Sequence, residues 1–297
     1  MTYPTVDKTK VSQSFSQAAN DYEQHAFIQQ KIAEYLIERL DFIKITPNSI
    51  LDIGCGAGRM SRQLHRRYPD AMVYGLDIAY QMVTQSRRHA PKPWLWLTPK
   101  LSYVCADAER LPIADNSMDL VVSNLTLQWC DAKTVFEEVA RILKPDGVFL
   151  FSTLGPDTLH ELRQSWAAVD EYSHVNFFLD MHDLGDALYQ SGLKDPVMDV
   201  DWLNFKYDSV DDIMRGLKAI GAHNITSQRP QGLMGKTKFK GMIKDYETRR
   251  TEKGLPVTYE VVYGHALGQV EQPETMHNGE VTISIDQIKR LQPTKPQ

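Results

Sequence analysis

The stretch LDIGCGAG, residues 51–58, joins a short apolar run to three glycines spaced two residues apart. Asp52 lies two residues before the first glycine, and a helical pattern begins after the last. Glycine adopts positive φ without strain and lets a ligand approach the backbone closely. Open α/β sheets bind ligands beyond the carboxyl ends of their parallel strands. The stretch therefore predicts a ligand-binding turn at the end of a central strand.

Strand-like and helix-like segments alternate outward from this turn. Apolar runs predict strands, and the segments between them have helical periodicity. This alternation is typical of a parallel sheet with right-handed crossovers. Two later strands complete an α/β fold, a doubly wound and mostly parallel sheet of seven strands. The predicted strands are 49–53, 71–77, 101–107, 118–124, 147–153 (after a turn at Pro145–Gly147), about 196–207, and 257–268, and the early helices are 61–68, 79–90 and 132–144.

The chain divides into three parts. Residues 1–45 are mostly helical, with a break near His25, because apolar side chains recur at three- and four-residue steps. Residues 46–270 hold the sheet, with helical insertions at about 157–191 and 208–254. Residues 271–297 form a loosely attached tail.

Composition narrows the class of protein. The chain has 297 residues, of which 42% are apolar and 24% charged, as in an ordinary globular protein. Its net charge of −5 argues against general nucleic-acid binding. No apolar run approaches the ~20 residues that span a bilayer, and the stretch MTYPTVDKTK lacks the apolar region of a secretory signal. Three cysteines without a CxxC pair predict packed, reduced thiols, no metal site and a cytoplasmic location.

The glycine turn could belong to a dinucleotide site, but two features argue against that. The dinucleotide pattern has a third glycine at its sixth position, where this chain has Arg59. Asp52, two residues before the first glycine, does not help a pyrophosphate and suits a ligand with an ammonium group. S-adenosylmethionine has a zwitterionic amino acid end and no phosphate.

The next two strands also end on acids. Asp77 follows Gly54 by 23 residues, the place of an acid that binds ribose hydroxyls in doubly wound folds. Asp107 can accept from an adenine amino group, and Ile78 and Met82 can sandwich the base. Each acid alone could be a helix N-cap, but acids at three successive strand ends favour a cofactor site. Taken together, the pattern resembles a class I S-adenosylmethionine-dependent methyltransferase, and that resemblance assigns the cofactor to Asp52, Gly54, Gly56, Gly58, Asp77, Ile78, Met82, Asp107, Ala108 and Asn124.

Four longer stretches resemble a narrower family. They are similar to the BioC family, the malonyl-carrier-protein O-methyltransferases of biotin synthesis, and the resemblance runs from about residue 8 to about residue 265. The Pro- and Trp-containing segment 91–100 and the tail depart from the family. The four stretches are FSQAANDYEQHA (15–26), SNLTLQWC (123–130), LHELRQSWAAVDEYSHVNFF (159–178) and LKAIGAHN (217–224).

The resemblance implies a specific reaction. The free carboxylate of a malonyl thioester on acyl carrier protein attacks the methyl group of S-adenosylmethionine and becomes a methyl ester. A carboxylate is already ionised at pH 7, so no general base is required. Catalysis then reduces to alignment, which can contribute ~7–11 kcal/mol. Desolvating the anion demands hydrogen-bond donors inside the pocket.

Five residues are candidates for the acceptor side of the site. Arg163 and Lys218 could bind the malonyl carboxylate, because a guanidinium matches a carboxylate and an ammonium attracts one; each could instead be solvated or ion-paired. Tyr22 lies in the N-terminal helices, which fold over the cofactor as a lid in this superfamily, and its hydroxyl could orient a carboxylate or merely pack. Gln128 and Trp129 should form the wall where methyl group and acceptor meet, although Trp129 could simply cap the core. His25, His174 and Asn176 are weaker candidates.

An acidic carrier protein should dock on a basic surface. The segment GKTKFKGMIKDYETRRTEKG (235–254) has seven Lys or Arg and three acids, with Phe239, Met242 and Ile243 interleaved. A second basic cluster, from Arg59 to Arg67, follows the glycine turn. Either could equally be a solvated helix face.

Other functions remain open from sequence. One is methylation of a quinone or phenol, which predicts a more apolar pocket without need of Arg163. Another is a non-methylating assembly factor or hydroxylase, because residues 184–221 also resemble mitochondrial complex I assembly relatives of the family. A third is a protein that only senses S-adenosylmethionine.

Overall fold

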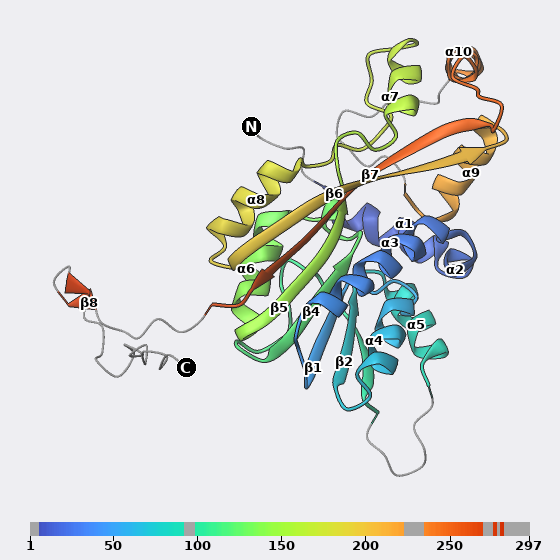
Figure 1. Cartoon of the computed structure of the whole chain (residues 1–297). Helices are drawn as coiled ribbons and strands as arrows, with labels where there is room; N and C mark the ends of the chain where they lie inside the picture. The colour runs from blue at the N-terminus through green and yellow to red at the C-terminus, as the bar shows by residue number, and fades with distance from the viewer. Residues whose placement is uncertain (1–5, 92–98, 223–234, 270–275, 278–279, 282–297) are drawn as a thin grey trace, which may run out of the picture.

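The structure is a computed structural model that describes residues 6–91, 99–222, 235–269, 276–277 and 280–281. Its centre is a seven-stranded sheet in the order β3-β2-β1-β4-β5-β7-β6 (Figure 1). The first five strands are parallel, and β7 runs antiparallel to both β5 and β6. This is the predicted doubly wound, mostly parallel sheet. The strands are β1 (Ser49–Ile53), β2 (Met72–Asp77), β3 (Leu101–Cys105), β4 (Met118–Asn124), β5 (Leu143–Leu154), β6 (Lys194–Tyr207) and β7 (Leu255–Leu267).

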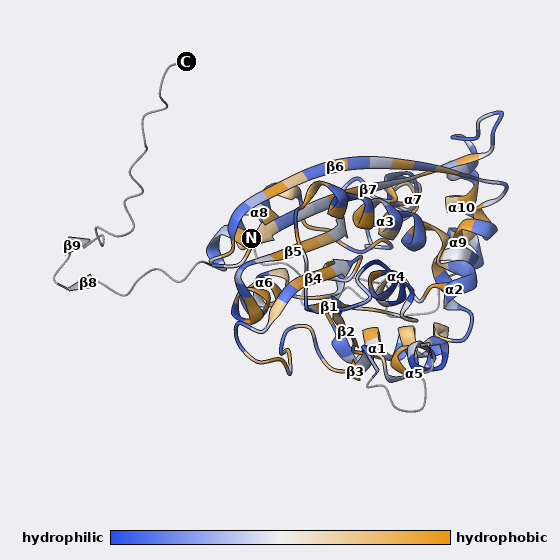
Figure 2. Cartoon of the chain, turned by 60° about the horizontal axis from the view of Figure 1, so that its bottom comes forward, coloured by the Kyte–Doolittle hydropathy of each residue, from blue (hydrophilic) through white to orange (hydrophobic). Residues whose placement is uncertain are grey.

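Side chains alternate between two hydrophobic cores, one on each face of the sheet. Ile50, Leu120 and Leu150 point to one face, where α3 (Phe27–Glu38), α4 (Arg59–Arg67) and α5 (Tyr80–His89) pack. Their neighbours point to the other face, against α6 (Ala132–Ile142) and α8 (Met181–Gln190). Both faces are covered, so the central strands are apolar throughout, as buried parallel strands are. In Figure 2 the edge strand β6 alternates between polar and apolar segments.

The two strands β6 and β7 extend beyond the rest of the sheet. Pairing of β5 with β7 stops at Val261, whereas β6 and β7 stay paired as far as Leu255. This ribbon supports α7 (His160–Ala167), α9 (Val210–Ala219) and α10 (Lys236–Glu247), which lie beside its end in Figure 1. These helices fall in the two predicted insertions, and they provide a second wall beside the end of the sheet.

The N-terminal segment folds as separate short helices, α1 (Lys8–Ala18), α2 (Tyr22–His25) and α3, followed by a 3-10 turn at Arg39–Phe42. The break near His25 was predicted. The additional break after α1 was not, and it places α1 beside α5 while α3 packs on β4 and β5.

Three local predictions need correction. The Pro145–Gly147 turn lies inside β5, where it forms a bulge with Asp146 at φ 61° and shifts the register against β4. The insertion predicted at about 157–191 is helical only in part, because α7 ends at Ala167 and α8 begins at Met181. Cys105 is exposed at the end of edge strand β3, whereas Cys55 is buried, as expected of a packed thiol, and Cys130 is half-buried.

Within the described ranges, no helix is long and apolar enough to cross a membrane. In the same residues no group of three or more His, Cys, Asp or Glu side chains could hold a metal ion. Most of the 91–100 segment and of the predicted tail lies outside the described residues, apart from the paired strands β8 (Met276–His277) and β9 (Glu280–Val281).

Candidate functional site

The glycine turn connects β1 to α4 with its backbone at positive φ. Gly54, Gly56 and Gly58 have φ of 71°, 53° and 80°. A Cβ atom on Gly54 would lie 1.9 Å from the hydroxyl oxygen of Thr126, so no other residue fits there. The amides of Gly54 and Cys55 donate to the carbonyl of Leu76, which ties the turn to β2.

Two buried carboxyl groups lie behind this turn. Asp52 accepts from Ser61 Oγ at 2.5 Å, and Asp77 accepts from the amides of Gly56 and Ala79 at 2.9 and 2.8 Å. Burial raises the pKa of Asp52 to about 7, against the lowering effect of Ser61 and with a further rise from Asp77. Burial likewise raises the pKa of Asp77 to about 6, although the two amides oppose it. These carboxyl groups are therefore poised to ionise fully when a cation binds.

Most of the predicted cofactor residues line two adjoining cavities. One, of about 70 Å³, contains eight of them, and Lys8, Phe15 and Tyr22 of the N-terminal helices cover it. The second, of about 60 Å³, contains Asp52 and shares the turn with the first. Gly58 lines neither cavity, and its carbonyl accepts from Tyr103 Oη at 3.4 Å. The eight in the first cavity are Gly54, Gly56, Asp77, Ile78, Met82, Asp107, Ala108 and Asn124.

An ion pair joins the lid to the cofactor site. Lys8 Nζ at the start of α1 lies 2.6 Å from both carboxylate oxygens of Asp107 and 2.5 Å from Glu109. An adenine amino group would thus share the Asp107 oxygens with this ammonium. Ser12 of the same helix donates to the carbonyl of Ile78 at 3.1 Å. Sequence reasoning did not find Lys8, because nothing in the sequence shows which strand end α1 reaches.

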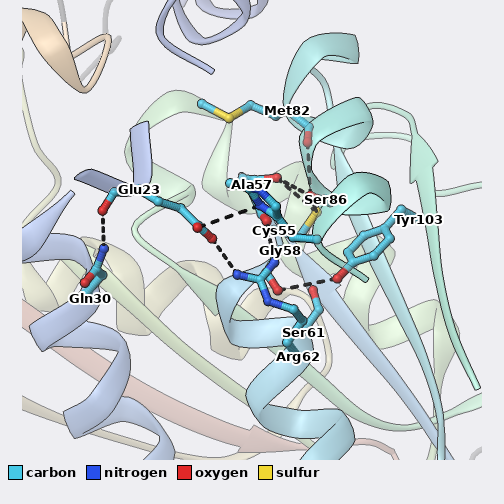
Figure 3. A network of polar contacts seen from close by, with 12 residues as sticks. Glu23, Gln30, Cys55, Ala57, Gly58, Ser61, Arg62, Met82, Ser86 and Tyr103 are labelled. Atoms are coloured by element: carbon cyan, nitrogen blue, oxygen red, sulfur yellow. Dashed lines mark hydrogen bonds and ion pairs between the residues drawn. The ribbon is translucent and has the colours of Figure 1, made fainter. Parts of the chain in front are cut away.

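A second connection runs from α2 to the glycine turn (Figure 3). Arg62 of α4 donates to the carbonyl of Ala57 at 2.8 Å and forms an ion pair with Glu23. Gln30 Nε2 donates to the carbonyl of Glu23 at 2.7 Å, and Ser86 Oγ to that of Gly56 at 2.7 Å. Arg62 belongs to the second predicted basic cluster, and its pairing with Glu23 makes it a structural link of the lid.

The rest of that cluster is largely neutralised as well. Arg67 is paired with Asp41 at 2.5 Å, and Arg59 lies 3.6 Å from Glu34. A docking role for this cluster is therefore not favoured, because three of its guanidinium groups already face carboxylates.

A third cavity, of about 440 Å³, adjoins the cofactor cavities. Its wall is mostly apolar and comes from the N-terminal helices, the end of β4, α7 and α9. Four of the five predicted acceptor residues line it. Phe15, Tyr22, Leu125 and Trp129 line both this cavity and the 70 Å³ cofactor cavity, and the rings of Phe15 and Trp129 meet edge to face at 5.4 Å. The four predicted residues are Tyr22, Gln128, Trp129 and Lys218.

Gln128 has a fixed side chain. Its Nε2 donates to the carbonyl of Leu125 at 2.8 Å, and its Oε1 accepts from Thr153 Oγ1 at 3.1 Å. The amide therefore presents one orientation to the cavity, and its second N–H is available for a ligand. Trp129 belongs to a 3-10 turn, Leu127–Trp129, directly after β4. Residues of SNLTLQWC thus line the 440 Å³ cavity from the end of a central strand, and their role as the acceptor wall stays a prediction.

Tyr22 lines all three cavities. Burial, and then the charge of Asp77, raise the pKa of its phenol, so the hydroxyl stays protonated. It can donate a hydrogen bond but cannot act as a base at neutral pH. His25 is exposed beside an outer groove that Lys218 also lines.

The charged lining of the 440 Å³ cavity, called the large cavity below, is positive only. Among the described residues that line it, Lys218 is the only lysine or arginine, and none is an aspartate or glutamate. Lys218 is exposed and forms no ion pair with a described residue. His174 also lines the cavity, stacked on Trp166 with ring centroids 3.8 Å apart and hydrogen-bonded to Asp170 at 2.8 Å. Asn176 lines the cavity beside them.

Arg163 is the predicted residue that the structure does not bring to the cavity wall. Its guanidinium donates to the carbonyls of Pro156 and Thr158 at 2.7 and 3.2 Å. Burial lowers its pKa, and within the described residues it forms no salt bridge. Its helix neighbours Leu159 and Leu162 face the cavity instead. The rotation of α7 about its axis decides which of its side chains face the cavity, and the sequence alone did not show that rotation.

Comparisons with known proteins agree with this geometry. A family model described as a methyltransferase domain matches residues 51–151. Two proteins called malonyl-[acyl-carrier protein] O-methyltransferase, from Gallionella capsiferriformans and Nitrosospira multiformis, are 48% and 47% identical to this chain. Each alignment covers 88% of this chain, and they cover 91% and 89% of the relatives.

Solved structures support the fold. The YcgJ protein from Bacillus subtilis matches with a TM-score of 0.56 at 18% identity, over 80% of this chain and 99% of its own. A putative methyltransferase from Bacillus halodurans matches with the same TM-score at 13% identity, over 80% and 99% of the two chains. At such low identity the likeness concerns the fold alone.

Proposed function

The chain belongs to the malonyl-[acyl-carrier protein] O-methyltransferase family, and from this premise we propose that it methylates the free carboxylate of malonyl-acyl carrier protein. The methyl donor is S-adenosylmethionine, and the methyl ester that forms primes pimeloyl formation in biotin biosynthesis. The enzyme is accordingly a carboxyl O-methyltransferase. The three free thiols are consistent with a reducing cytoplasm.

The observation that carries this proposal is the charge of the large cavity. An anionic acceptor needs a pocket without carboxylates and with at least one positive group, and the described lining of this cavity meets both conditions through Lys218. Four residues line both this cavity and the 70 Å³ cofactor cavity, so an acceptor bound in the first lies next to a cofactor bound in the second.

The residues of the two smaller cavities fit S-adenosylmethionine. Asp52 and Asp77 offer carboxylates for the ammonium and ribose groups, and Ile78 and Met82 offer apolar contacts for adenine. When bound, the cofactor supplies an electrophilic methyl group on a sulfonium. The protein contributes by closing Phe15, Tyr22 and Trp129 around the place where the acceptor enters, which excludes water and restricts its direction of approach.

No residue of the site needs to remove a proton, because a malonyl carboxylate is already ionised. The Tyr22 hydroxyl and the free N–H of Gln128 act as donors that orient the acceptor. Lys218 compensates its negative charge. The Trp129 ring forms part of the apolar wall that the acyl chain of the acceptor contacts.

Arg163 is proposed as a second partner of the carboxylate. Buried charges in proteins are normally paired, yet this guanidinium contacts only backbone carbonyls among the described residues. Two of its five N–H groups are used there, so three remain for an anion. Reaching the cavity requires a change of its side-chain rotamer.

The carrier protein is proposed to dock on α10. Lys236, Lys240 and Lys244 are exposed and form no ion pair with a described residue, whereas Lys238 is paired with Asp170 at 3.2 Å. Met242 is buried and Phe239 half-buried on the opposite side, so the helix is amphipathic, as its sequence predicts. The apolar side of α10 packs against α7, where Phe239 meets Trp166, and residues of α7 line the acceptor cavity.

The decisive assay combines purified protein, S-adenosylmethionine labelled in its methyl group, and malonyl-acyl carrier protein. We expect label in the carrier protein that mild base releases as methanol, which identifies a methyl ester. Acetyl-acyl carrier protein, which has no free carboxylate, should remain unlabelled. Cofactor binding without transfer to the malonyl thioester would overturn the proposal.

A phenolic or quinone acceptor should be included in the same assay. The mostly apolar cavity and the position of Arg163 outside its lining are features that this alternative would share. Faster transfer to a neutral phenol than to the malonyl thioester would favour it over the carboxylate.

A further inference from the structure

Gln29 lies at the junction of the acceptor and cofactor cavities. Among the described residues, only Tyr22 and Gln29 line both the 440 Å³ cavity and the 60 Å³ cavity that contains Asp52. The position is rigid, because Asn124 Nδ2 at the end of β4 donates to the carbonyl of Gln29 at 3.2 Å. Asn124 is itself held by Ser152, whose Oγ donates to its Oδ1 at 2.8 Å.

The side-chain oxygen of Gln29 is buried and has no hydrogen-bond partner among the described residues. A buried acceptor without a hydrogen bond destabilises the fold, because it has lost its water and gained no donor. Because Gln29 borders a cavity, we expect this oxygen to accept a hydrogen bond from a donor on a bound ligand.

The charges around the 60 Å³ cavity indicate which donor this is. Asp52 lines it and is buried, and Arg59 lines it with a partly exposed guanidinium that lies 3.6 Å from Glu34. Glu23, the third charged residue of the lining, is already paired with Arg62. A carboxylate and a guanidinium in one small cavity complement a zwitterionic amino acid. The malonyl carboxylate on the acceptor side is not such a donor, because it has no proton to give and would be repelled by a carbonyl oxygen.

We propose that Gln29 Oε1 accepts a hydrogen bond from the ammonium group of S-adenosylmethionine and so positions its amino acid arm. This assignment rests on the proposed function, and it adds a residue that turns the methyl-bearing sulfur toward the acceptor cavity. Gln29 is a positioning residue for the methyl group as well as a cofactor ligand. Loss of its oxygen weakens cofactor binding and misdirects the methyl group.

The test uses two variants. Gln29→Met keeps the length of the side chain and removes the hydrogen-bond acceptor, and Gln29→Glu keeps an acceptor oxygen. Binding is measured by titration calorimetry with S-adenosylhomocysteine, with its analogue lacking the amino group, and with 5′-methylthioadenosine, which lacks the whole amino acid end. A hydrogen bond to a charged group is worth about 1.5–3 kcal/mol, so Gln29→Met should weaken S-adenosylhomocysteine binding about 10- to 100-fold. Gln29→Glu should bind it at least as tightly as the unchanged protein.

The analogues locate the contact. Gln29→Met should leave the affinities of the deaminated analogue and of 5′-methylthioadenosine within about twofold. Gln24→Met, an exposed glutamine on the neighbouring helix, is the matched control and should change none of the affinities. A melting temperature no lower than that of the unchanged protein shows that each variant is folded; Gln29→Met can raise it, because the variant has no unpaired buried oxygen.

Two results would overturn the inference. One is an unchanged affinity of Gln29→Met for S-adenosylhomocysteine. The other is an equal loss for the deaminated analogue, which would place the contact elsewhere on the ligand. Failure of the unchanged protein to bind S-adenosylhomocysteine would instead contradict the proposed function, so the two failures are distinguishable.

Discussion

Lys8 Nζ lies 2.6 Å from both carboxylate oxygens of Asp107, although 99 residues separate the two in sequence. Asp107 lies at the start of the loop after β3 and lines the 70 Å³ cavity, and Lys8 begins α1, which covers that cavity. We therefore expect that this ion pair, or the helix that carries it, moves when the cofactor enters and leaves.

Lys8→Ala should accelerate release of S-adenosylhomocysteine. The pair is partly exposed, with 27% of the Lys8 side chain and 35% of the Asp107 side chain accessible, so its contribution is about 1 kcal/mol or less. The expected increase in the dissociation rate is about two- to fivefold, measured by stopped-flow displacement. Lys10→Ala, on the same helix but paired with exposed Asp7, is the control and should leave the rate unchanged. Equal rates for Lys8→Ala and the unchanged protein would show that α1 does not restrain the ligand.

Asp52→Asn should stabilise the protein without ligand at pH 8. Folding raises the pKa of Asp52 from its usual value near 4 to about 7, so the native state binds more protons than the unfolded state between these values. Stability therefore falls as the pH rises through this window. Above it the buried charge costs up to ~4 kcal/mol, which asparagine avoids. The melting temperature of the variant should exceed that of the unchanged protein at pH 8 and approach it near pH 4–5.

The same substitution should weaken S-adenosylhomocysteine binding at least tenfold, because a carboxylate facing an ammonium is lost. A variant that is more stable but binds less well would show that Asp52 is retained for the ligand. A lower melting temperature at pH 8 would contradict the stability argument.

Arg163→Ala and Lys218→Met should each raise the Michaelis constant for malonyl-acyl carrier protein and leave S-adenosylhomocysteine affinity unchanged. Loss of a charge-assisted hydrogen bond costs about 1.5–3 kcal/mol, or about 10- to 100-fold. Arg163→Lys should not restore the activity, because an ammonium lacks the planar fork of a guanidinium. Arg215→Gln, an exposed neighbour of Lys218 paired with Asp212, is the control. If only Lys218→Met changes the constant, Arg163 is removed from the site and its role is to hold the start of α7.

Lys240→Glu and Lys244→Glu should each slow transfer to malonyl-acyl carrier protein several-fold at low salt. Rim charges act mainly on association, so the effect should shrink as ionic strength rises. Transfer to malonyl-CoA, which has no protein surface to dock, should change little. Lys44→Glu makes the same change of charge at an exposed position before β1 and should have no effect on either acceptor. Equal losses with both acceptors would place these lysines in the chemistry of the site and not in docking.

Most of the residues that the sequence assigned to the cofactor lie together in the structure, and their role in binding it stays a prediction. Glycines at positive φ, acids at strand ends and apolar residues beside them are local features, because each depends on where a single strand ends. Eight of the ten predicted cofactor residues accordingly line one cavity, and Asp52 lines the next. The alternation of strands and helices predicted the mostly parallel sheet in the same way, and the structure supplied the strand order.

The acceptor side was predicted less completely. Tyr22, Gln128, Trp129 and Lys218 reach the cavity, whereas Arg163, chosen for its chemistry, points to backbone carbonyls because α7 presents Leu159 and Leu162 inward. Sequence periodicity shows that a helix has an apolar face, and it does not show which polar residue at the border of that face turns into a cavity.

The sequence by itself determined the sheet, the glycine turn and the class of cofactor, since hydrophobic periodicity and the special backbone of glycine act over a few residues. Only the tertiary structure decided which distant groups meet, such as Lys8 with Asp107 and Arg62 with Glu23. It also decided that the buried side-chain oxygen of Gln29 has no hydrogen-bond partner among the described residues. These contacts depend on how α1, α2 and α3 pack across the end of the sheet. That packing depends on many contacts between residues far apart in the sequence, so no single stretch of the chain predicts it.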